Sequence, residues 1–279
     1  MKYININGRI EDAINTIIPY DNGAFRYGYG LFETILFKDG RIELKELHWN
    51  RLFSGLDTLL FDVPKLMTKE YLEEQIILTV KTNKLEKLCR VRLQVYAHNS
   101  ALFDAARNNL EFIIECFELT DALININENG LILGIANGLQ KSMDSLCNLK
   151  TSNSLIYAMA AKQAKANKWD DALIYNTVGN IIESSIANVF WVKEQIIYTP
   201  PLASGCVAGT MRSFIITALR SSNIIVKDED ISLDNLLSAD EIFLTNAIRR
   251  VKWVYSIENK GFYKNNYTHH INKLLFYNK

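Results

Sequence analysis

The first third of the chain carries two kinds of hydrophobic pattern. Segments with alternating apolar and polar residues, or rich in β-branched residues, predict strands at 3–6, 31–37, 89–96 and 110–116. Apolar residues three or four positions apart predict helices at 44–60 and 68–82. The order of strands, helices and strands indicates an α+β domain.

A polar stretch after residue 117 separates this part from the remainder. We therefore expect an N-terminal α+β domain at 1–117, a linker at 118–126 and a C-terminal domain at 127–279. In the second domain the pattern predicts strands at 131–135, 172–175, 181–184, 188–192, 196–199 and 241–245. It predicts helices at 154–166, 210–221 and 233–237.

Composition bears on the partners, the compartment and the metal content that we expect for this protein. The 31 basic and 31 acidic residues balance, so the charge gives no reason to expect nucleic acid or a membrane as a partner. The four cysteines show no C-x-x-C spacing and are expected to be reduced, as in the cytoplasm. The N-terminus is typical of a strand, not of a signal peptide. The adjacent His269 and His270 lack metal-ligand spacing, and we expect no metal site.

Lys150 is the first candidate for chemistry. It precedes Thr151-Ser152-Asn153 and an amphipathic helical pattern. A lysine amine acts as a nucleophile when burial or a neighbouring cation favours its neutral form. From its position alone, a charged lysine on the surface is the favoured interpretation.

Glu183 is the second candidate. Alternation along 181–184 places it on the same strand face as Ile181, and a buried carboxylate needs a partner. A pyridinium N–H would be such a partner. The alternatives are a rim glutamate bonded to Ser184 or Ser185, and a salt bridge.

Two further features could bind phosphate. Arg51 lies in a helical pattern, and guanidinium is the preferred bidentate partner of phosphate. The alternative is a solvated arginine paired with Glu46 or Asp57. The glycine-containing segment 205–212 leads into a helix whose N-terminal N–H groups could bind an anion, although it also fits an ordinary helix entry.

Taken together, four segments resemble motifs of the class IV aminotransferases, which are fold-type IV pyridoxal-phosphate enzymes. Residues 21–34 are similar to D-R-G-x-x-Y-G-x-G-x-F-E-T, His48 to Leu52 to H-x-x-R-L, Leu149 to Asn153 to the lysine segment, and Gly179 to Phe190 to G-x-[IV]-x-E-x-x-x-x-N-x-F. The resemblance implies a two-domain architecture like that of D-amino acid aminotransferase, with pyridoxal 5'-phosphate (PLP) between the domains. It also implies a homodimer.

The resemblance also implies a role for each site residue. Lys150 holds PLP as a Schiff base and moves the Cα proton, while Glu183 keeps the pyridine nitrogen protonated. Tyr27 lines the substrate pocket. The remaining cofactor-binding residues are Arg51, Thr210 and Met211 at the phosphate, Val207 on the ring, and Asn246 on the phosphate side.

The resemblance leaves the reaction open between two chemistries. The first is transfer of an amino group between an amino acid and a 2-oxo acid. The second is elimination of pyruvate from 4-amino-4-deoxychorismate, which gives p-aminobenzoate. It is considered because residues 205–212 and 245–247 are similar to segments of 4-amino-4-deoxychorismate lyase. However, the segment 97–103 lacks the lyase's R-G-Y and also the R-x-H of D-amino acid aminotransferases. Leu155 stands where branched-chain enzymes carry tyrosine.

A non-enzymatic binding or scaffold protein with a decayed site is a third hypothesis. It would require an incomplete cofactor site. The joint presence of Lys150, Glu183 and Arg51 argues against it.

Overall fold

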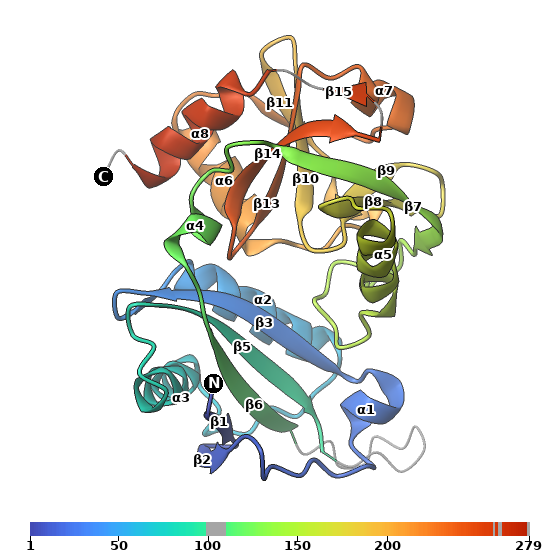
Figure 1. Ribbon diagram of the computed structural model, residues 1–279. Coiled ribbons are helices and arrows are strands. Elements are labelled where there is room, and N and C mark those ends of the chain that lie inside the picture. The colour runs from blue at the N-terminus through green and yellow to red at the C-terminus, as the bar shows by residue number, and fades with distance from the viewer. Residues whose placement is uncertain (99–109, 259, 262–263, 278–279) are drawn as a thin grey trace. The chain divides into compact units, whose positions relative to one another are not determined.

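The computed structural model describes residues 1–98, 110–258, 260–261 and 264–277. The chain forms two compact units (Figure 1). The first unit comprises Met1–Asp121 together with Leu149–Ser154, and the second comprises Ala122–Asn148 together with Leu155–Lys279.

The first unit is built on a six-stranded antiparallel sheet with strand order β2-β1-β6-β5-β3-β4. The strands are β1 (Tyr3–Ile6), β2 (Arg9–Asp12), β3 (Gly30–Lys38), β4 (Arg41–Ile42), β5 (Leu88–Ala97) and β6 (Leu110–Glu118). The helices are α1 (Gly23–Tyr27), α2 (Lys45–Thr58) and α3 (Lys69–Thr82), and α4 (Asp121–Ile124) begins at the boundary with the second unit.

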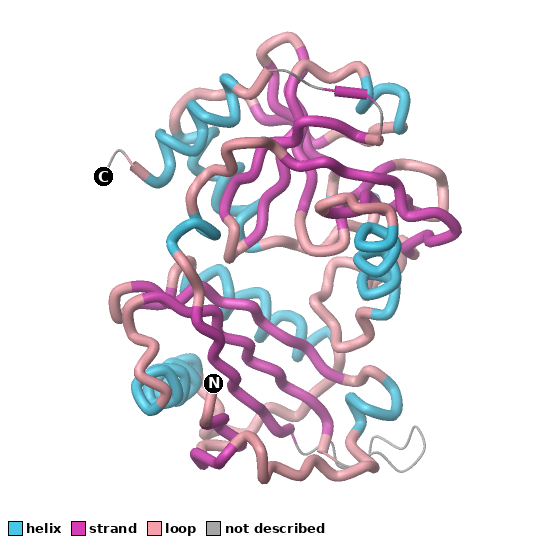
Figure 2. Tube along the Cα trace, in the orientation of Figure 1, coloured by secondary structure: helices cyan, strands magenta, loops and turns pink. Residues whose placement is uncertain are grey.

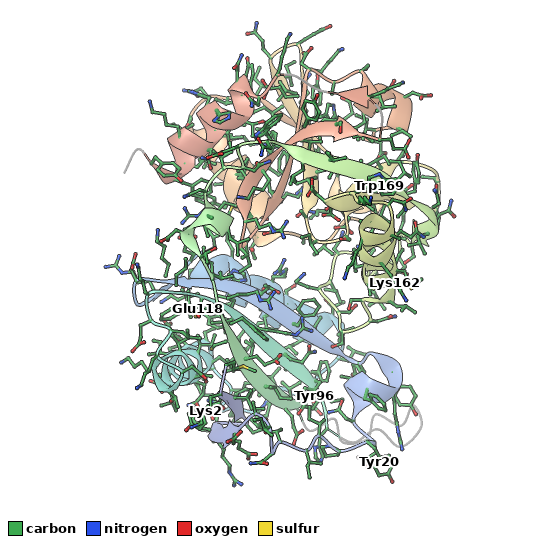
Figure 3. All side chains as sticks on the ribbon, viewed as in Figure 1. Lys2, Tyr20, Tyr96, Glu118, Lys162 and Trp169 are labelled. Atoms are coloured by element: carbon green, nitrogen blue, oxygen red, sulfur yellow. The ribbon has the colours of Figure 1, made fainter. Side chains whose placement is uncertain are left out.

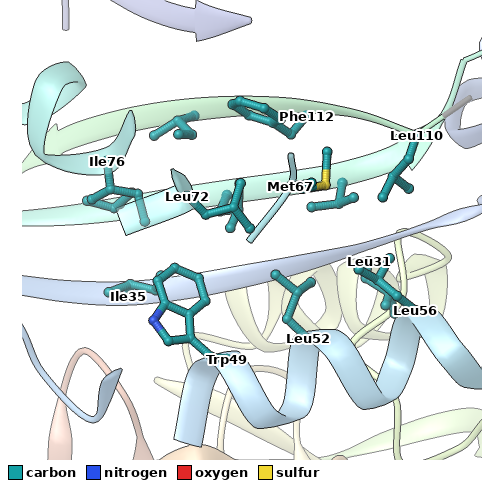
Figure 4. Packing of buried hydrophobic residues seen from close by; sticks show 14 of the residues in the cluster. Leu31, Ile35, Trp49, Leu52, Leu56, Met67, Leu72, Ile76, Leu110 and Phe112 are labelled. Carbon is teal, nitrogen blue, oxygen red and sulfur yellow. The ribbon is translucent and has the colours of Figure 1, made fainter. Parts of the chain in front are cut away.

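One face of this sheet forms the core of the first unit. Trp49, Leu52 and Leu56 project from α2 against Leu31 and Ile35 of β3 (Figure 4). Alternation along β3 sends Phe32 to the opposite face, which also carries the half-buried polar side chains of β5. The sheet therefore has a dry side under the helices and a more polar side.

The second unit contains a nine-stranded sheet. Its strands are β7 (Leu131–Lys141), β8 (Asp171–Asn176), β9 (Ile181–Ser184), β10 (Asn188–Lys193), β11 (Ile196–Thr199), β12 (Val226–Asp228), β13 (Glu241–Asn246), β14 (Arg250–Ile257) and β15 (Lys260–Gly261). The order is β12-β11-β10-β13-β14-β7-β8-β9, and β9 also pairs with β10. That additional pairing closes six of the strands into a ring.

The second unit also contains helices, which lie between and after its strands in the chain. They are α5 (Leu155–Ala166), the 3₁₀ turn η1 (Leu202–Ser204), α6 (Thr210–Ser221), α7 (Leu233–Leu237) and α8 (Asn266–Phe276). Trp169, labelled in Figure 3, packs so closely on Gly134 of β7 that a Cβ at position 134 would collide with its ring. Among the helices of the described residues, none has the length and apolar character needed to cross a bilayer.

Two features differ from the sequence-based expectation. Strand β7 extends to Lys141 instead of ending at 135, because Gln140 and Lys141 pair with Tyr175 and Asn176 of β8. The segment 149–154 was expected within the C-terminal domain at 127–279, but it packs with the first unit. The physical reason is its pairing with β3, in which Leu31 forms an antiparallel bridge with Thr151.

We predict that Leu56→Ala will lower the free energy of unfolding by about 2–5 kcal/mol, because it leaves a cavity in the core of the first unit. Leu56 is fully buried. Urea unfolding followed by tryptophan fluorescence measures the change. Leu66→Ala is the matched control, since Leu66 is 83% exposed. Equal effects of the two substitutions would contradict the assignment of this core.

Candidate active site

Backbone hydrogen bonds hold Lys150 on strand β3. The Phe32 N–H donates to the carbonyl of Lys150 at 2.9 Å, and the Ser152 N–H donates to the carbonyl of Gly30 at 2.8 Å. Lys150 thus lies in the loop between β7 and α5 that Figure 2 shows, yet its main chain is fixed like that of a strand residue.

The amine of Lys150 lies over an aromatic ring. Its Nζ is 4.4 Å from the centroid of the Phe32 ring, and the guanidinium carbon of Arg92 is 3.8 Å from the same centroid. An aromatic face attracts a cation, and a neighbouring cation is one of the features that favour a neutral lysine amine. Two cationic groups, those of Lys150 and Arg92, therefore lie near the ring of Phe32.

Glycines allow the Lys150 segment to approach the first unit so closely. A Cβ at Gly30 would contact the Val95 carbonyl and Ser152 Oγ, and one at Gly28 would collide with Asn153. Gly28 also has φ +67°, a left-handed conformation that favours glycine. The Gly28-Tyr29-Gly30 sequence thus has a packing role.

Arg51 forms a buried ion pair on α2. Its Nε donates to Glu33 Oε1 at 2.8 Å and its Nη2 donates to Glu33 Oε2 at 2.5 Å. His48 Nδ1 lies 2.6 Å from Glu33 Oε2. The expected alternative, a solvated arginine paired with Glu46 or Asp57, is wrong, because β3 supplies a buried acid that no helical spacing predicts.

The carboxylate of Glu33 is fully compensated. Burial alone would raise its pKa, but the opposing charges of Arg51 and His48, with their hydrogen bonds, lower the pKa of Glu33 to about 2. The bidentate contact uses two of the five guanidinium N–H groups of Arg51. Glu33 therefore fixes the orientation of this arginine.

Lys150 and Arg51 contact the side chains of two neighbouring residues of β3. Lys150 contacts β3 through Phe32, and Arg51 contacts it through Glu33, whose side chain points to the opposite face. Tyr27, the predicted substrate residue, closes α1 and is partly exposed. These three predicted residues all belong to the first unit.

Glu183 is the centre of the polar cluster in the second unit. Its Oε1 accepts from Lys141 Nζ at 2.7 Å and from Tyr157 Oη at 2.8 Å, and its Oε2 accepts from the Val207 N–H at 2.9 Å. The structure therefore brings the predicted residues Glu183 and Val207 into direct contact. It also contains the salt bridge that was the alternative for Glu183.

The predicted phosphate-binding residues Thr210 and Met211 form the first turn of α6. Gly209 is the N-cap, and no side chain of the described residues caps this helix end. A Cβ at position 209 would collide with Asn188 Oδ1, so glycine is required there. The first N–H groups of α6 consequently lack partners within the helix, which is the arrangement that binds anions.

A buried hydroxyl group lies on β13, the strand that pairs with β10. Thr245 pairs with Asn188 in the β10–β13 ladder, and its Oγ1 is buried with no hydrogen-bond partner among the described residues. The predicted residue Asn246 follows it. Asn246 donates to the Ile186 carbonyl and accepts from the Ile248 and Arg249 N–H groups, so it shapes the turn after β13.

Sequence reasoning missed several residues of these clusters. Lys141 and Tyr157 lie 42 and 26 positions from Glu183 in the chain, and neither belongs to a motif that marks it. Thr245 precedes the predicted Asn246, and its buried, unsatisfied hydroxyl appears only in three dimensions. Glu33 was part of the F-E-T segment, which could have indicated a partner for Arg51.

Comparison with known proteins decides the family. Residues 30–257 match the family described as amino-transferase class IV. The chain belongs to this family. The resemblance drawn from the four sequence segments is thereby confirmed.

Relatives of this class IV aminotransferase are named either as aminodeoxychorismate lyases or as branched-chain aminotransferases. The aminodeoxychorismate lyase of Vibrio harveyi is 27% identical over 88% of this chain and 90% of its own. A Methanocaldococcus jannaschii protein assigned to the branched-chain-amino-acid aminotransferases is 26% identical over 92% and 88% of the two chains. The crystal structure of a T.th. branched-chain amino acid aminotransferase with pyridoxamine 5'-phosphate superposes with a TM-score of 0.86, at 22% identity over 98% of this chain and 92% of that one.

The class IV aminotransferase chain is therefore a PLP-dependent enzyme with the expected two-domain, fold-type IV architecture. Its residues fit this cofactor on three observations. The uncapped α6 with Gly209 suits a phosphate, and the orphan hydroxyl of Thr245 can donate to one. The carboxylate of Glu183 suits a ring N–H.

We predict that Glu33→Gln will lower stability by about 3 kcal/mol at pH 7, because the folded pKa of Glu33 lies well below its ordinary value. A group with a lowered folded pKa stabilises the protein above its unfolded pKa and loses this effect as pH falls. The advantage of the wild type should therefore shrink by about 1.4 kcal/mol between pH 6 and pH 3.5. Chemical denaturation across this range measures it.

Glu46→Gln is the control for this substitution. The Glu46 side chain is 70% exposed, and its ion pair with Lys69 is long at 4.0 Å and therefore weak. Its effect should stay within about 0.5 kcal/mol. A Glu33→Gln protein with the pH profile of the wild type would refute the compensated ion pair.

Proposed function

We propose that this enzyme transfers an amino group between an amino acid and a 2-oxo acid, with Lys150 as the catalytic residue. The observation that carries the proposal is the position of Lys150, whose main chain is fixed to β3 while its amine lies over Phe32. An amine held in one place by its backbone can alternate between binding a carbonyl carbon and handling a proton. The second relative's assignment to the branched-chain-amino-acid aminotransferases supports this reaction.

Lys150 has two tasks in this proposal. When bound, PLP supplies an aldehyde that forms bonds with amines and a ring that accepts electron pairs. Lys150 would hold the aldehyde of PLP through Nζ while no substrate is bound. Once free, the amine Nζ would take up the proton that leaves the substrate Cα and would donate a proton back in the later part of the reaction.

The other predicted residues bind and orient. We propose that Glu183 accepts the ring N–H through Oε2, and that Val207, which fixes Oε2, packs on the ring. The N–H groups of Thr210 and Met211 bind the phosphate together with Arg51, whose orientation is fixed by Glu33. Asn246 holds the turn on the phosphate side, and Tyr27 contacts the substrate.

A second candidate reaction is the release of pyruvate from 4-amino-4-deoxychorismate. The identity with the Vibrio harveyi lyase favours it, as do the segments 205–212 and 245–247. The segment 97–103 argues against it because it lacks the lyase's R-G-Y. Residues 99–103 of that segment lie outside the described residues.

One pair of assays separates the two reactions. Purified enzyme is supplied with 2-oxoglutarate and a panel of L- and D-amino acids that includes leucine, valine and alanine. In parallel it is supplied with 4-amino-4-deoxychorismate, and p-aminobenzoate is measured. Glutamate formation in the first assay supports amino transfer, whereas p-aminobenzoate without glutamate assigns the chain to the second reaction.

We predict that Lys150→Ala will abolish the absorption band of the Schiff base between PLP and the enzyme and lower turnover by about 1,000-fold or more. Absorbance spectroscopy and the assay above measure both effects. Lys162→Ala, at an exposed position on α5, is the matched control and should leave both unchanged. An unchanged spectrum in Lys150→Ala would refute the assignment of this lysine.

We also propose that the enzyme acts as a homodimer. The segment 14–25 of the first unit exposes five large side chains: Ile14, Ile17, Ile18, Tyr20 and Phe25. Tyr20 projects outward from this segment in Figure 3. Contiguous exposed apolar groups mark interaction surfaces, and a second copy of the chain is the partner that the family resemblance implies.

We propose a cytoplasmic location on the basis of the thiols. All four cysteines of the chain are free and buried in the structure. Reduced cysteines persist in a reducing compartment, which agrees with the composition.

We predict that the wild type will have the mass of a dimer at micromolar concentration, and that Ile14→Lys/Ile17→Lys will be monomeric. Two buried ammonium groups would oppose association because each would lose its hydration. Light scattering measures the mass. Leu66→Lys, an exposed apolar site outside the segment, should remain dimeric. A monomeric wild type would overturn this proposal.

A further inference from the structure

The hydrogen bonds to Glu183 are distributed unequally over its two carboxylate oxygens. Three donors already reach the carboxylate: Lys141 Nζ, Tyr157 Oη and the Val207 N–H. Two of them bind Oε1 and only one binds Oε2. A carboxylate offers about four acceptor positions, so the position that the described contacts leave open lies on Oε2.

Lys141 is the cation of this cluster. Its Nζ lies 2.7 Å from Glu183 Oε1 and 5.2 Å from the centroid of the Tyr157 ring. The side chains of Lys141 and Glu183 are only 10% and 4% exposed. Solvent therefore screens their attraction weakly, and each charge strongly affects what else the carboxylate can bind.

The other titratable groups facing Glu183 stay neutral near pH 7. Burial, reinforced by Glu183, raises the pKa of the Tyr157 phenol. Burial also raises the pKa of the Cys206 thiol to about 12 and raises the pKa of the Cys147 thiol. Among the described groups of the cluster, Lys141 alone compensates the charge of Glu183.

We propose that Lys141 is a positioning residue that sets how strongly Glu183 holds the proton on the ring nitrogen of PLP. The inference rests on the proposed function of Glu183. An ammonium on Oε1 competes electrostatically with a pyridinium on Oε2, because both cations are bound to one carboxylate. Lys141 thus holds the carboxylate of Glu183 in place while it weakens the attraction of that carboxylate for the ring proton.

The arrangement has a chemical purpose. A ring nitrogen that keeps its proton accepts electrons strongly, and one that loses it accepts them weakly. The positive charge of Lys141, at the end of β7, adjusts the proton affinity of the ring nitrogen by binding the opposite oxygen of Glu183. Lys141 acts through Glu183 and contacts no substrate in this proposal.

The test is the titration of the ring nitrogen in protein loaded with ¹⁵N-labelled PLP, followed by NMR. In Lys141→Gln the side chain can still donate a hydrogen bond but carries no charge. The ring nitrogen should then keep its proton to a pH at least about one unit higher than in the wild type, which is a tenfold change in proton affinity. Lys141→Arg retains the charge and should titrate as the wild type does.

Glu183→Gln separates this inference from the proposed function. If Glu183 binds the ring nitrogen, that variant should show an unprotonated nitrogen throughout the range. A wild-type titration in Glu183→Gln would refute the role of Glu183 itself. A wild-type titration in Lys141→Gln, together with an altered one in Glu183→Gln, would refute only the role of Lys141.

A second variant covers the case in which Lys141→Gln fails to load the cofactor. Tyr157→Phe removes the neutral donor from Oε1 and leaves Lys141 in place. Glu183 should then hold the ring proton more strongly, by about threefold, since one hydrogen bond to the carboxylate is lost. A titration identical to that of the wild type would mean that the donors on Oε1 do not affect the ring nitrogen, and this would overturn the inference, because Lys141 acts through the same oxygen.

Discussion

The burial of negative charge is the constraint on which both units depend. A carboxylate removed from water must be compensated by cations and hydrogen bonds, or it takes up a proton. The chain buries Glu33 in the first unit and Glu183 in the second, and it supplies each with a basic side chain at 2.5–2.7 Å. Each buried acid in turn fixes the position of its basic partner, Arg51 in the first unit and Lys141 in the second.

The two clusters solve this problem differently. Glu33 is surrounded by Arg51 and His48, so both of its oxygens are engaged and its function is to orient the arginine. Glu183 has its partners concentrated on Oε1, and Oε2 receives only a backbone N–H. Glu33 thus orients its neighbours, whereas Oε2 of Glu183 can still accept a further hydrogen bond.

The sequence predicted most of the elements because their hydrophobic periods are clear. The pattern at 44–60 contains α2, and the alternation at 89–96 lies within β5. It did not predict β14 or α8, in which basic and polar residues such as Arg250, Lys252 and Asn272 are buried. Burial of these residues depends on neighbours far away in the chain, and no local period records it.

The site shows the same division. Motif resemblance named Lys150, Glu183 and Arg51, but it could not name Lys141, Tyr157 or Thr245. Their proximity to the site follows from the extension of β7, the start of α5 and the β10–β13 register. The roles of the named residues stay predictions, whereas the family and the cofactor are established by comparison.

The membership of Leu149–Ser154 in the first unit has a practical consequence for dissecting the molecule. The chain enters and leaves that unit within six residues, and the strand partner of this short piece begins near residue 30. A fragment cut at the boundary near residue 121 would carry Lys150 away from the main-chain groups of Gly30 and Phe32 that hold it. The two units therefore cannot be expressed separately with the lysine in its native setting, and their evolution by recombination at that boundary would be constrained in the same way.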